Sequence, residues 1–146
     1  MKLFYAPGSS SLLPHIVLHE AELPFEPIKI DEHTKAISGG SDYRSVNPLF
    51  YKGMPEEGRD VFRTRLRARF THLDRHLSSN ECVMGRDYWV ADAHFFVVSN
   101  WASWVDFDLS PYSAVLAHRQ RVGSRPAVIA ALEAEGLVPW PATQPP

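Results

Sequence analysis

The first 31 residues predict a strand, a helix and a second strand, and no later stretch of the chain predicts another strand. Residues 2–6 form a short apolar and aromatic run that Pro7 and Gly8 end, and residues 28–31 alternate apolar and polar side chains. A helix of about three turns between two strands is typical of a right-handed parallel βαβ unit. The chain is therefore expected to fold as an α+β protein with a small parallel sheet.

The start of the first helix can be located from Pro14, because only the first positions of a helix tolerate a missing N–H group. With Ser11 as the N-cap, Pro14 falls at the third helical position, whereas an N-cap at Ser9 or Ser10 would remove a helical hydrogen bond. Ser9 and Ser10 are therefore expected in the loop before the helix. Leu23, which precedes a proline, is expected to end the helical region.

The rest of the chain predicts helices. Apolar residues recur at helical spacing over 57–78, residues 91–107 are largely apolar on all sides, and shorter helices are expected over 112–122 and 126–135. Residues 34–48 are rich in turn-forming residues, and the tail from Val138 to Pro146 holds four prolines. The pattern divides the chain into residues 1–50, with the two strands, and residues 51–146, which are helical apart from the tail.

Composition excludes two classes of partner. With 15 Lys and Arg residues against 17 Asp and Glu residues, the chain lacks the basic surface that non-specific nucleic-acid binding needs. No apolar run approaches the roughly 18–20 residues of a membrane span, and the N-terminus holds no signal-peptide core. We therefore expect a cytoplasmic protein that binds neither nucleic acid nor membrane.

The single Cys82 has apolar neighbours and is expected to be a buried, inert thiol.

Two histidine pairs have the spacing of metal ligands on a helix, His15 with His19 and His72 with His76. No acidic residue completes a known metal-binding spacing around either pair. We therefore expect no metal, and histidines that are solvated or cap helices.

The loop before the first helix is a place where an anion can be held. The N–H groups of the first helical turn and the positive end of the helix dipole both point at it. A thiol bound there would ionise more readily, with Ser10 or Ser9 donating a hydrogen bond to the thiolate and Tyr5 as a second hydroxyl within reach. The alternative is that Ser9 and Ser10 only satisfy backbone groups of a tight turn.

Two blocks of the sequence also carry residues that are spaced as in a known family. The first block comprises residues 1–5, 7–12, His15-Ile16, Glu20, Asp31, Lys35, Gly40, Asp42-Tyr43 and 46–48. The second comprises residues 55–57, Gly85-Arg86, 91–93, Trp101-Ala102, Arg125-Pro126 and 134–137. Together they resemble bacterial beta-class glutathione S-transferases. The resemblance implies a truncated thioredoxin-like βαβ unit over residues 1–50, an all-helical domain over residues 51–146 and glutathione as co-substrate.

The chain departs from this family at several places. Between Pro48 and Leu49 it lacks several dozen residues, which in the family carry the cis-proline loop, the remaining strands, a Glu-Ser pair that grips the γ-glutamyl end of glutathione, and one helix. The family's cysteine is replaced by Ser10, which can hydrogen-bond a thiolate but cannot form a mixed disulfide. Trp89 stands where the family has a helix-capping Ser or Thr, although Asp92 keeps the other half of that capping box.

Two functions are compatible with the resemblance. In the first, the protein conjugates the thiol of glutathione to small hydrophobic electrophiles. In the second, it is a non-catalytic binding or scaffold protein that keeps the fold and has lost the glutathione site. The residues that the first function would use are Ser10 and Tyr5 for the thiolate, Ser11 and Lys35 for glutathione, and Trp101 and Trp104 for the electrophile pocket. Simple packing is the alternative role of the two tryptophans.

The missing strands also bear on assembly. In the family the first strand lies inside the sheet, so here residues 2–6 are expected to present an open, apolar edge. A two-stranded sheet is marginal by itself, and closed two-fold pairing is the commonest way to cover such a surface. We therefore expect a homodimer with Phe4 buried at the interface, as in a family that is itself dimeric.

Overall fold

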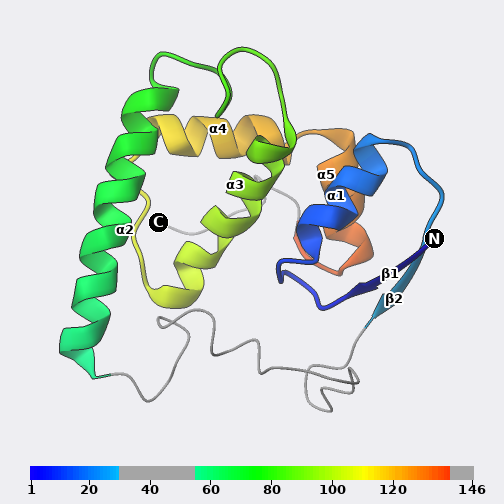
Figure 1. Cartoon of the computed structure of the whole chain (residues 1–146), viewed down its shortest axis with the longest axis horizontal. Coiled ribbons are helices and arrows are strands. Elements are labelled where there is room, and N and C mark those ends of the chain that lie inside the picture. Colours follow the sequence, from blue (N-terminus) through cyan, green and yellow to red (C-terminus); the bar gives the residue numbers. More distant parts are fainter. Residues whose placement is uncertain (30–54, 139–146) are drawn as a thin grey trace.

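A computed structural model describes residues 1–29 and 55–138 of the chain (Figure 1). The described residues form a small two-stranded sheet followed by helices, which confirms the expected α+β class. In chain order the elements are β1 (Lys2–Tyr5), α1 (Leu12–Glu20), β2 (Glu26–Lys29), α2 (Glu56–Leu77), α3 (Val90–Asn100), the 3-10 helix η3 (Trp101–Val105), α4 (Ser113–Gly123) and α5 (Pro126–Ala134).

The two strands pair in parallel, as the βαβ pattern predicts. Lys2 lies opposite Glu26, and Tyr5 lies opposite Lys29. Side chains of β1 alternate: Leu3 and Tyr5 are buried, whereas Phe4 between them is 57% exposed. β2 begins two residues earlier than the sequence pattern indicates, because Glu26 and Pro27 pair with the start of β1.

Helix α1 begins where Pro14 predicts it. Ser11 is the N-cap residue and Leu12 the first helical residue. The helix buries Leu12 and Ile16 in a cluster with side chains of α3, α4 and α5 (Ala93, Phe96, Val97, Val122, Val128, Ala131 and Leu132). In Figure 1, α1 and α5 lie side by side. The first helix therefore shares one core with the later helices, and the division into residues 1–50 and 51–146 stays a prediction.

A second cluster joins α2 to the middle of the helical part. Phe70 stacks on Phe107 with ring centroids 5.2 Å apart, and Tyr112 packs against both rings. The amphipathic helix predicted over residues 57–78 is thus confirmed with its apolar face buried, since Phe70 and Leu77 both belong to this cluster.

The central helix is shorter than the sequence pattern predicts. It ends as an α-helix at Asn100 and continues as η3 to Val105. Asp106 then adopts a left-handed conformation with φ 51°, and the N–H of Phe107 turns back to donate to the carbonyl of Ala102. A left-handed residue cannot continue an α-helix, so the expected helix to residue 107 is wrong in its last part.

Asp92 organises the start of α3. Its Oδ2 accepts a hydrogen bond from the backbone N–H of Trp89 at 2.9 Å, which is the half of the capping box that the sequence keeps. Its Oδ1 accepts from the N–H of Val83 at 2.8 Å and contacts Nε2 of His118 at 2.8 Å. The side chains of Asp92 and His118 are both fully buried. This carboxylate therefore ties together the loop before α3, α3 itself and α4.

Cys82 is partly exposed rather than buried, because Cys82 and Gly85 face each other in a tight bridge at the surface. Partial burial, followed by the charge of Asp92, raises the pKa of its thiol. Its nucleophilic thiolate form is therefore disfavoured, in agreement with the expectation of an inert thiol.

Within the described ranges, no helix has the length and apolar character that crossing a membrane requires.

Candidate functional site

The loop over residues 6–11 joins β1 to α1 and turns sharply at Gly8. Gly8 has φ +70°, a backbone conformation that residues with a Cβ rarely adopt. The N–H of Ser9 donates to the carbonyl of Ala6 at 3.1 Å and closes the turn. A Cβ at Gly8 would also lie 3.1 Å from the ring of Trp104. Both the turn and the close approach of Trp104 therefore require glycine here.

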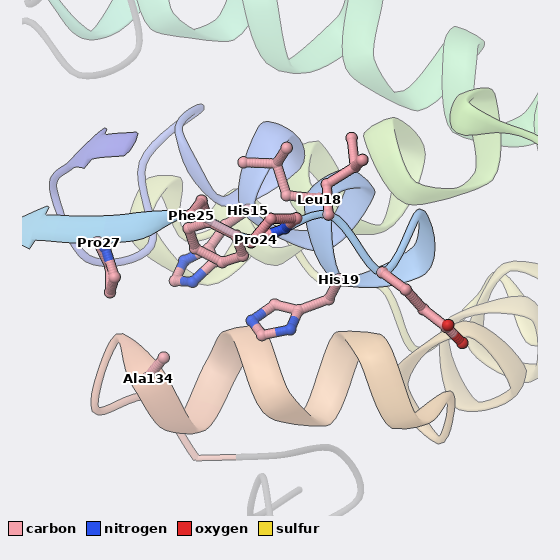
Figure 2. A pocket seen from close by; sticks show the side chains of 9 residues that line it. His15, Leu18, His19, Pro24, Phe25, Pro27 and Ala134 are labelled. Atoms are coloured by element: carbon pink, nitrogen blue, oxygen red, sulfur yellow. The ribbon is translucent and has the colours of Figure 1, made fainter. Parts of the chain in front are cut away.

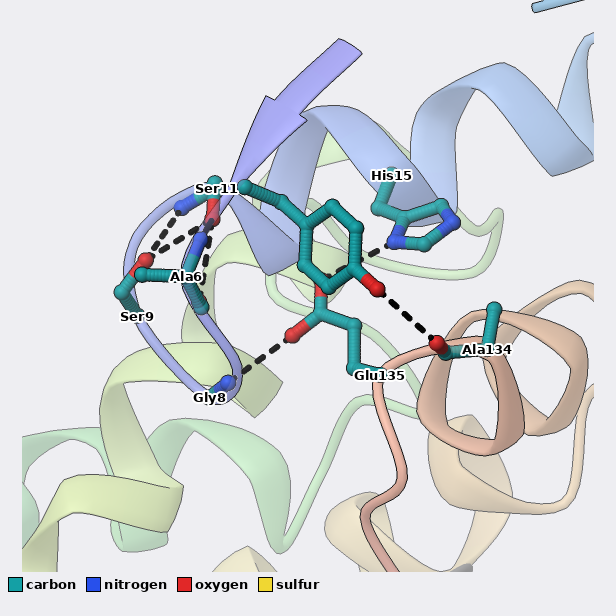
Figure 3. A network of polar contacts seen from close by, with 8 residues as sticks. Ala6, Gly8, Ser9, Ser11, His15, Ala134 and Glu135 are labelled. Carbon is teal, nitrogen blue, oxygen red and sulfur yellow. Dashed lines mark hydrogen bonds and ion pairs between the residues drawn. The ribbon is translucent and has the colours of Figure 1, made fainter. Parts of the chain in front are cut away.

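Two serine hydroxyls fasten this loop. The Ser11 hydroxyl accepts from the N–H of Ala6 at 3.1 Å and is 3.2 Å from the carbonyl oxygen of Ala6. Ser9 Oγ lies 2.8 Å from Ser11 Oγ and accepts from the N–H of Ser11 (Figure 3). Ser9 thus has the backbone-satisfying role that was the alternative to a role in thiol binding. Ser11 stands at the N-cap position, but its hydroxyl bonds back to Ala6 rather than to the helix.

The first N–H groups of α1 are engaged within the loop. Leu12 donates to the carbonyl of Ser9 at 3.0 Å, and Leu13 donates to the carbonyl of Ser10 at 3.2 Å. The expectation that these groups point freely at a bound anion is therefore wrong for Leu12 and Leu13. Ser10 itself is a turn residue of the loop and is partly exposed.

The loop does hold an anion, and that anion is a carboxylate of the chain itself. Glu135 directly follows α5, and its side chain is fully buried. Its Oε2 accepts from the N–H of Gly8 at 2.8 Å, and its Oε1 lies 2.9 Å from Nδ1 of His15 (Figure 3). An ionised carboxylate has only acceptors, so with Glu135 ionised it is Nδ1 of His15 that donates to Oε1.

His15 is therefore neither solvated nor a helix cap, and that expectation is wrong. The ring is fully buried, and it packs against the ring of Tyr5 with centroids 5.5 Å apart. The hydroxyl of Tyr5 donates to the carbonyl of Ala134 at 3.2 Å (Figure 3). The end of α5 thus binds both β1, through Tyr5, and α1, through His15.

Trp101 and Trp104 also contact the loop, at Gly8. Nε1 of Trp101 donates to the carbonyl of Gly8 at 2.9 Å, and the ring of Trp104 packs against Gly8. Trp104 is nevertheless 56% exposed, so it is not a simple core residue. Gly8 is therefore held through its N–H by Glu135 and through its carbonyl by Trp101.

Trp101 also lines an apolar pocket of about 350 Å³ between α2, α3 and η3. Its other lining residues are Phe62, Arg65, Leu66, Arg69, Phe70, Val98, Ala102, Val105 and Phe107. Trp104, the second residue expected at such a pocket, is not among them. Lys35, expected to bind glutathione, lies outside the described residues.

Sequence reasoning missed Glu135 as a member of this site. One signal was available: a carboxylate next to the C-terminal end of a helix lies at the negative end of the helix dipole, where it is disfavoured. A glutamate at that position needs a compensating partner. Here the partners are Gly8 and His15, more than a hundred residues earlier in the chain.

Comparison with known proteins identifies relatives of one kind. No family model matches the chain. Glutathione S-transferase GstA of Escherichia coli O157:H7 is 26% identical over 200 positions, which cover 94% of this chain and 100% of that protein. Because 200 positions exceed the 146 residues of this chain, the alignment contains gaps on its side. The gaps agree with the expected loss of an internal segment.

Solved structures give the same result. A ternary complex of BphK, a bacterial GST, is 30% identical and superposes with a TM-score of 0.82, covering 94% of this chain and 100% of that one. A sphingomonad glutathione S-transferase complexed with glutathione is 25% identical, with a TM-score of 0.81 and the same coverage of both chains.

Proposed function

This chain belongs to the bacterial glutathione S-transferase family, as a member with a shortened thioredoxin-like part, and we propose that it conjugates the thiol of glutathione to hydrophobic electrophiles. One observation carries the proposal. Trp101 donates to the carbonyl of Gly8 in the loop before α1 and also lines the apolar pocket of about 350 Å³. A thiol held at the loop and an apolar compound in the pocket would therefore be neighbours.

The proposed reaction begins with loss of the thiol proton of glutathione to solvent. The thiolate then attacks an electrophilic carbon, the S–C bond forms, and the leaving group departs with the electron pair of its bond. The N-terminal end of the α1 dipole favours the thiolate. Ser10, a partly exposed residue of the loop, is the proposed hydrogen-bond donor to the sulfur. Tyr5 is the second candidate, and it would first have to release the carbonyl of Ala134.

Glutathione itself is proposed to contact Ser11 and Lys35. The family's γ-glutamyl anchor belongs to the segment that this chain lacks. A charge-assisted contact is worth about 1.5–3 kcal/mol, so its loss should weaken binding by roughly one to two orders of magnitude. We therefore expect affinity in a range that millimolar glutathione can saturate only in part.

The electrophile is proposed to lie on the aromatic floor of the pocket beside Trp101. Phe62, Phe70 and Phe107 supply that floor, and Arg65 and Arg69 stand one helical turn apart on the α2 side. Aromatic walls bind planar apolar compounds with little specificity beyond shape. Trp104 is proposed to contact the electrophile only where it emerges near the loop.

A second function is favoured by one specific observation. The N–H groups of Gly8, Leu12 and Leu13 are all engaged by groups of the chain itself. A glutathione thiolate would then find fewer donors than the loop position suggests. In this second proposal the protein is a non-catalytic binding or scaffold protein that keeps the transferase fold and has lost the glutathione site.

Calorimetric titration with glutathione separates the two proposals. The first predicts measurable heat at millimolar glutathione, and no heat at that concentration would contradict it. If conjugation of a chloronitrobenzene is also detected, Ser10→Ala should slow it about tenfold or more, because a hydrogen bond to a charged sulfur is lost. Ser9→Ala is the matched control: it removes a hydroxyl that fastens the loop but no proposed contact to the sulfur, so it should slow the reaction less than Ser10→Ala does. Equal effects of both substitutions would contradict the role of Ser10.

We also propose that the chain forms a homodimer through β1. The exposed Phe4 supports this, because an aromatic side chain on a two-stranded sheet is a surface that pairing would cover. Phe4→Glu should give a monomer by light scattering at micromolar concentration. Val61→Glu, at another exposed apolar position, should not change the mass. A wild-type monomer, or a dimer that survives Phe4→Glu, would contradict the proposed interface.

A further inference from the structure

A second pocket lies along α1 and shares no lining residue with the apolar pocket beside Trp101. It has a volume of about 530 Å³, within the range of small-molecule sites. Its lining residues are His15, Leu18, His19, Glu22, Leu23, Pro24, Phe25, Pro27 and Ala134, drawn from α1, the α1–β2 connection, β2 and α5 (Figure 2). We call it the His15–His19 pocket.

Both histidines of this pocket carry a buried ring nitrogen without a hydrogen-bond partner among the described residues, namely Nε2 of His15 and Nε2 of His19. For His15, the hydrogen bond made by Nδ1 decides whether Nε2 is a donor or an acceptor. Nδ1 donates to Glu135, so in the neutral ring Nε2 is a bare acceptor. A buried polar atom that stays unpaired is costly, so Nε2 marks a place where a donor from a ligand would be stabilising.

His19 also favours a hydrogen-bond acceptor on the pocket wall. Burial, and then the neighbouring His15, lowers the pKa of His19, which favours its neutral ring. The two imidazoles stack with centroids 5.2 Å apart and planes 20° apart. Phe25 contacts both rings edge-on, at 5.3 Å from His15 and 5.1 Å from His19. The pocket therefore presents the edges of two imidazole rings within an aromatic wall.

The ring geometry argues against a metal ion. Two histidines on one zinc ion hold their nitrogens about 2.0–2.1 Å from it, so their lone pairs must converge. In near-parallel stacked rings the in-plane lone pairs of His15 and His19 run side by side instead. Across residues 1–29 and 55–138, no group of three or more His, Cys, Asp or Glu side chains could hold a metal ion.

The other lining residues restrict the charge and polarity of the ligand. Leucine, proline, phenylalanine and alanine side chains make most of the surface apolar. Glu22, which also lines the pocket, would repel a carboxylate or sulfonate. The chemistry calls for a neutral, apolar ring compound with a single hydroxyl donor.

We propose that the His15–His19 pocket binds a neutral phenol, whose O–H donates to Nε2 of His15 while its ring lies among Leu18, Phe25 and Pro27. This proposal does not rest on the proposed transferase reaction. A ligand bound in the pocket would perturb Glu135, because His15 and the loop residue Gly8 both contact that carboxylate.

Three probes of one size test the ligand class in the full chain. 2-Naphthol offers the hydroxyl, 2-methoxynaphthalene lacks the donor, and 2-naphthoate carries a charge. Calorimetry should show 2-naphthol binding about tenfold more tightly than the methyl ether, and no binding of the carboxylate. Equal affinities of 2-naphthol and its methyl ether, or tightest binding of 2-naphthoate, would overturn the proposal.

The site is located without removing either histidine. In protein with ¹⁵N-labelled imidazoles, 2-naphthol should shift the Nε2 resonance of His15 upfield, as expected for an accepted hydrogen bond, and the methyl ether should not. Leu18→Trp, which fills the pocket, should abolish this shift. Val17→Trp is the matched control, because Val17 is on the same helix and does not line the pocket. An unmoved His15 resonance, or a shift that persists in Leu18→Trp, would place the phenol elsewhere and overturn the assignment.

Discussion

Two buried carboxylates of this protein, Asp92 and Glu135, each face a fully buried histidine, and the difference between them lies in what they connect. Asp92 bonds to Val83, Trp89 and His118, all from the helical part of the chain. Glu135 follows the last described helix, but its partners are Gly8 and His15 from the first fifteen residues.

The same chemistry therefore serves two purposes. Asp92 stabilises a helix start, so its loss should affect the helical core as a whole. Glu135 fixes the conformation of the loop on which the proposed thiol site depends, from the far end of the chain. Because the loop is anchored by α5 and by Trp101 of η3, a chain with a shortened sheet can still keep the loop in place.

Asp92→Ala gives the largest expected effect. Removing it leaves His118 buried without its partner and deprives two backbone N–H groups of an acceptor, which should lower the free energy of unfolding by about 3–5 kcal/mol. Urea denaturation followed by circular dichroism measures it. Asp108→Ala is the control, because Asp108 is an exposed carboxylate that bonds only to Ser110 among the described residues. Similar losses in both variants would show that Asp92 is not a special anchor.

Glu135→Gln should cost less and act more locally. The amide keeps an oxygen for the N–H of Gly8 but brings an NH₂ group against the donor Nδ1 of His15, so a loss of about 1–3 kcal/mol is expected. In ¹⁵N–¹H spectra the amides of Gly8 to Leu13 should move. Asp92→Asn, the matched change, should leave those loop amides in place. Unmoved loop amides in Glu135→Gln would break the distinction between the two carboxylates.

Gly8→Ala tests the loop at the residue whose N–H donates to Glu135. The alanine must adopt φ +70° and displace the ring of Trp104, so a loss of about 1–2 kcal/mol is expected. Gly136→Ala is the control: it has φ +71° with open space around the position, so it bears the backbone strain alone and should cost less. In a Trp104→Ala background the two glycine substitutions should become equal. A persistent difference would mean that Trp104 is not what crowds Gly8.

The local features of this fold could be predicted, and the long-range ones could not. Pro14 located the start of α1 because the missing N–H of proline acts within one helical turn. The capping role of Asp92 was likewise a pattern of neighbouring residues. The contacts that build the site, from Glu135 to Gly8 and from Trp101 to Gly8, join residues 127 and 93 positions apart and leave no periodic trace in the sequence.

The smallest expected effect is the pH dependence of the His118 pair. Burial lowers the pKa of His118, and its hydrogen bond to Asp92 opposes that shift only in part. The unfolded chain therefore takes up a proton below about pH 6.5 before the folded chain does, and stability falls as the pH drops from 7 to 5. His118→Gln should flatten this decline in urea titrations at pH 7, 6 and 5. A variant with the same slope as wild type would assign the pH dependence to other groups.

The proposed transferase function requires that the loop held by Glu135 and Trp101 binds glutathione. Titration of ¹⁵N-labelled protein with glutathione up to about 10 mM, followed by ¹⁵N–¹H spectra, tests it most directly, since that range spans the weak binding expected without the γ-glutamyl anchor. We expect concentration-dependent shifts centred on the amides of residues 8–13. Unchanged spectra, or shifts confined to residues outside the loop, would contradict it.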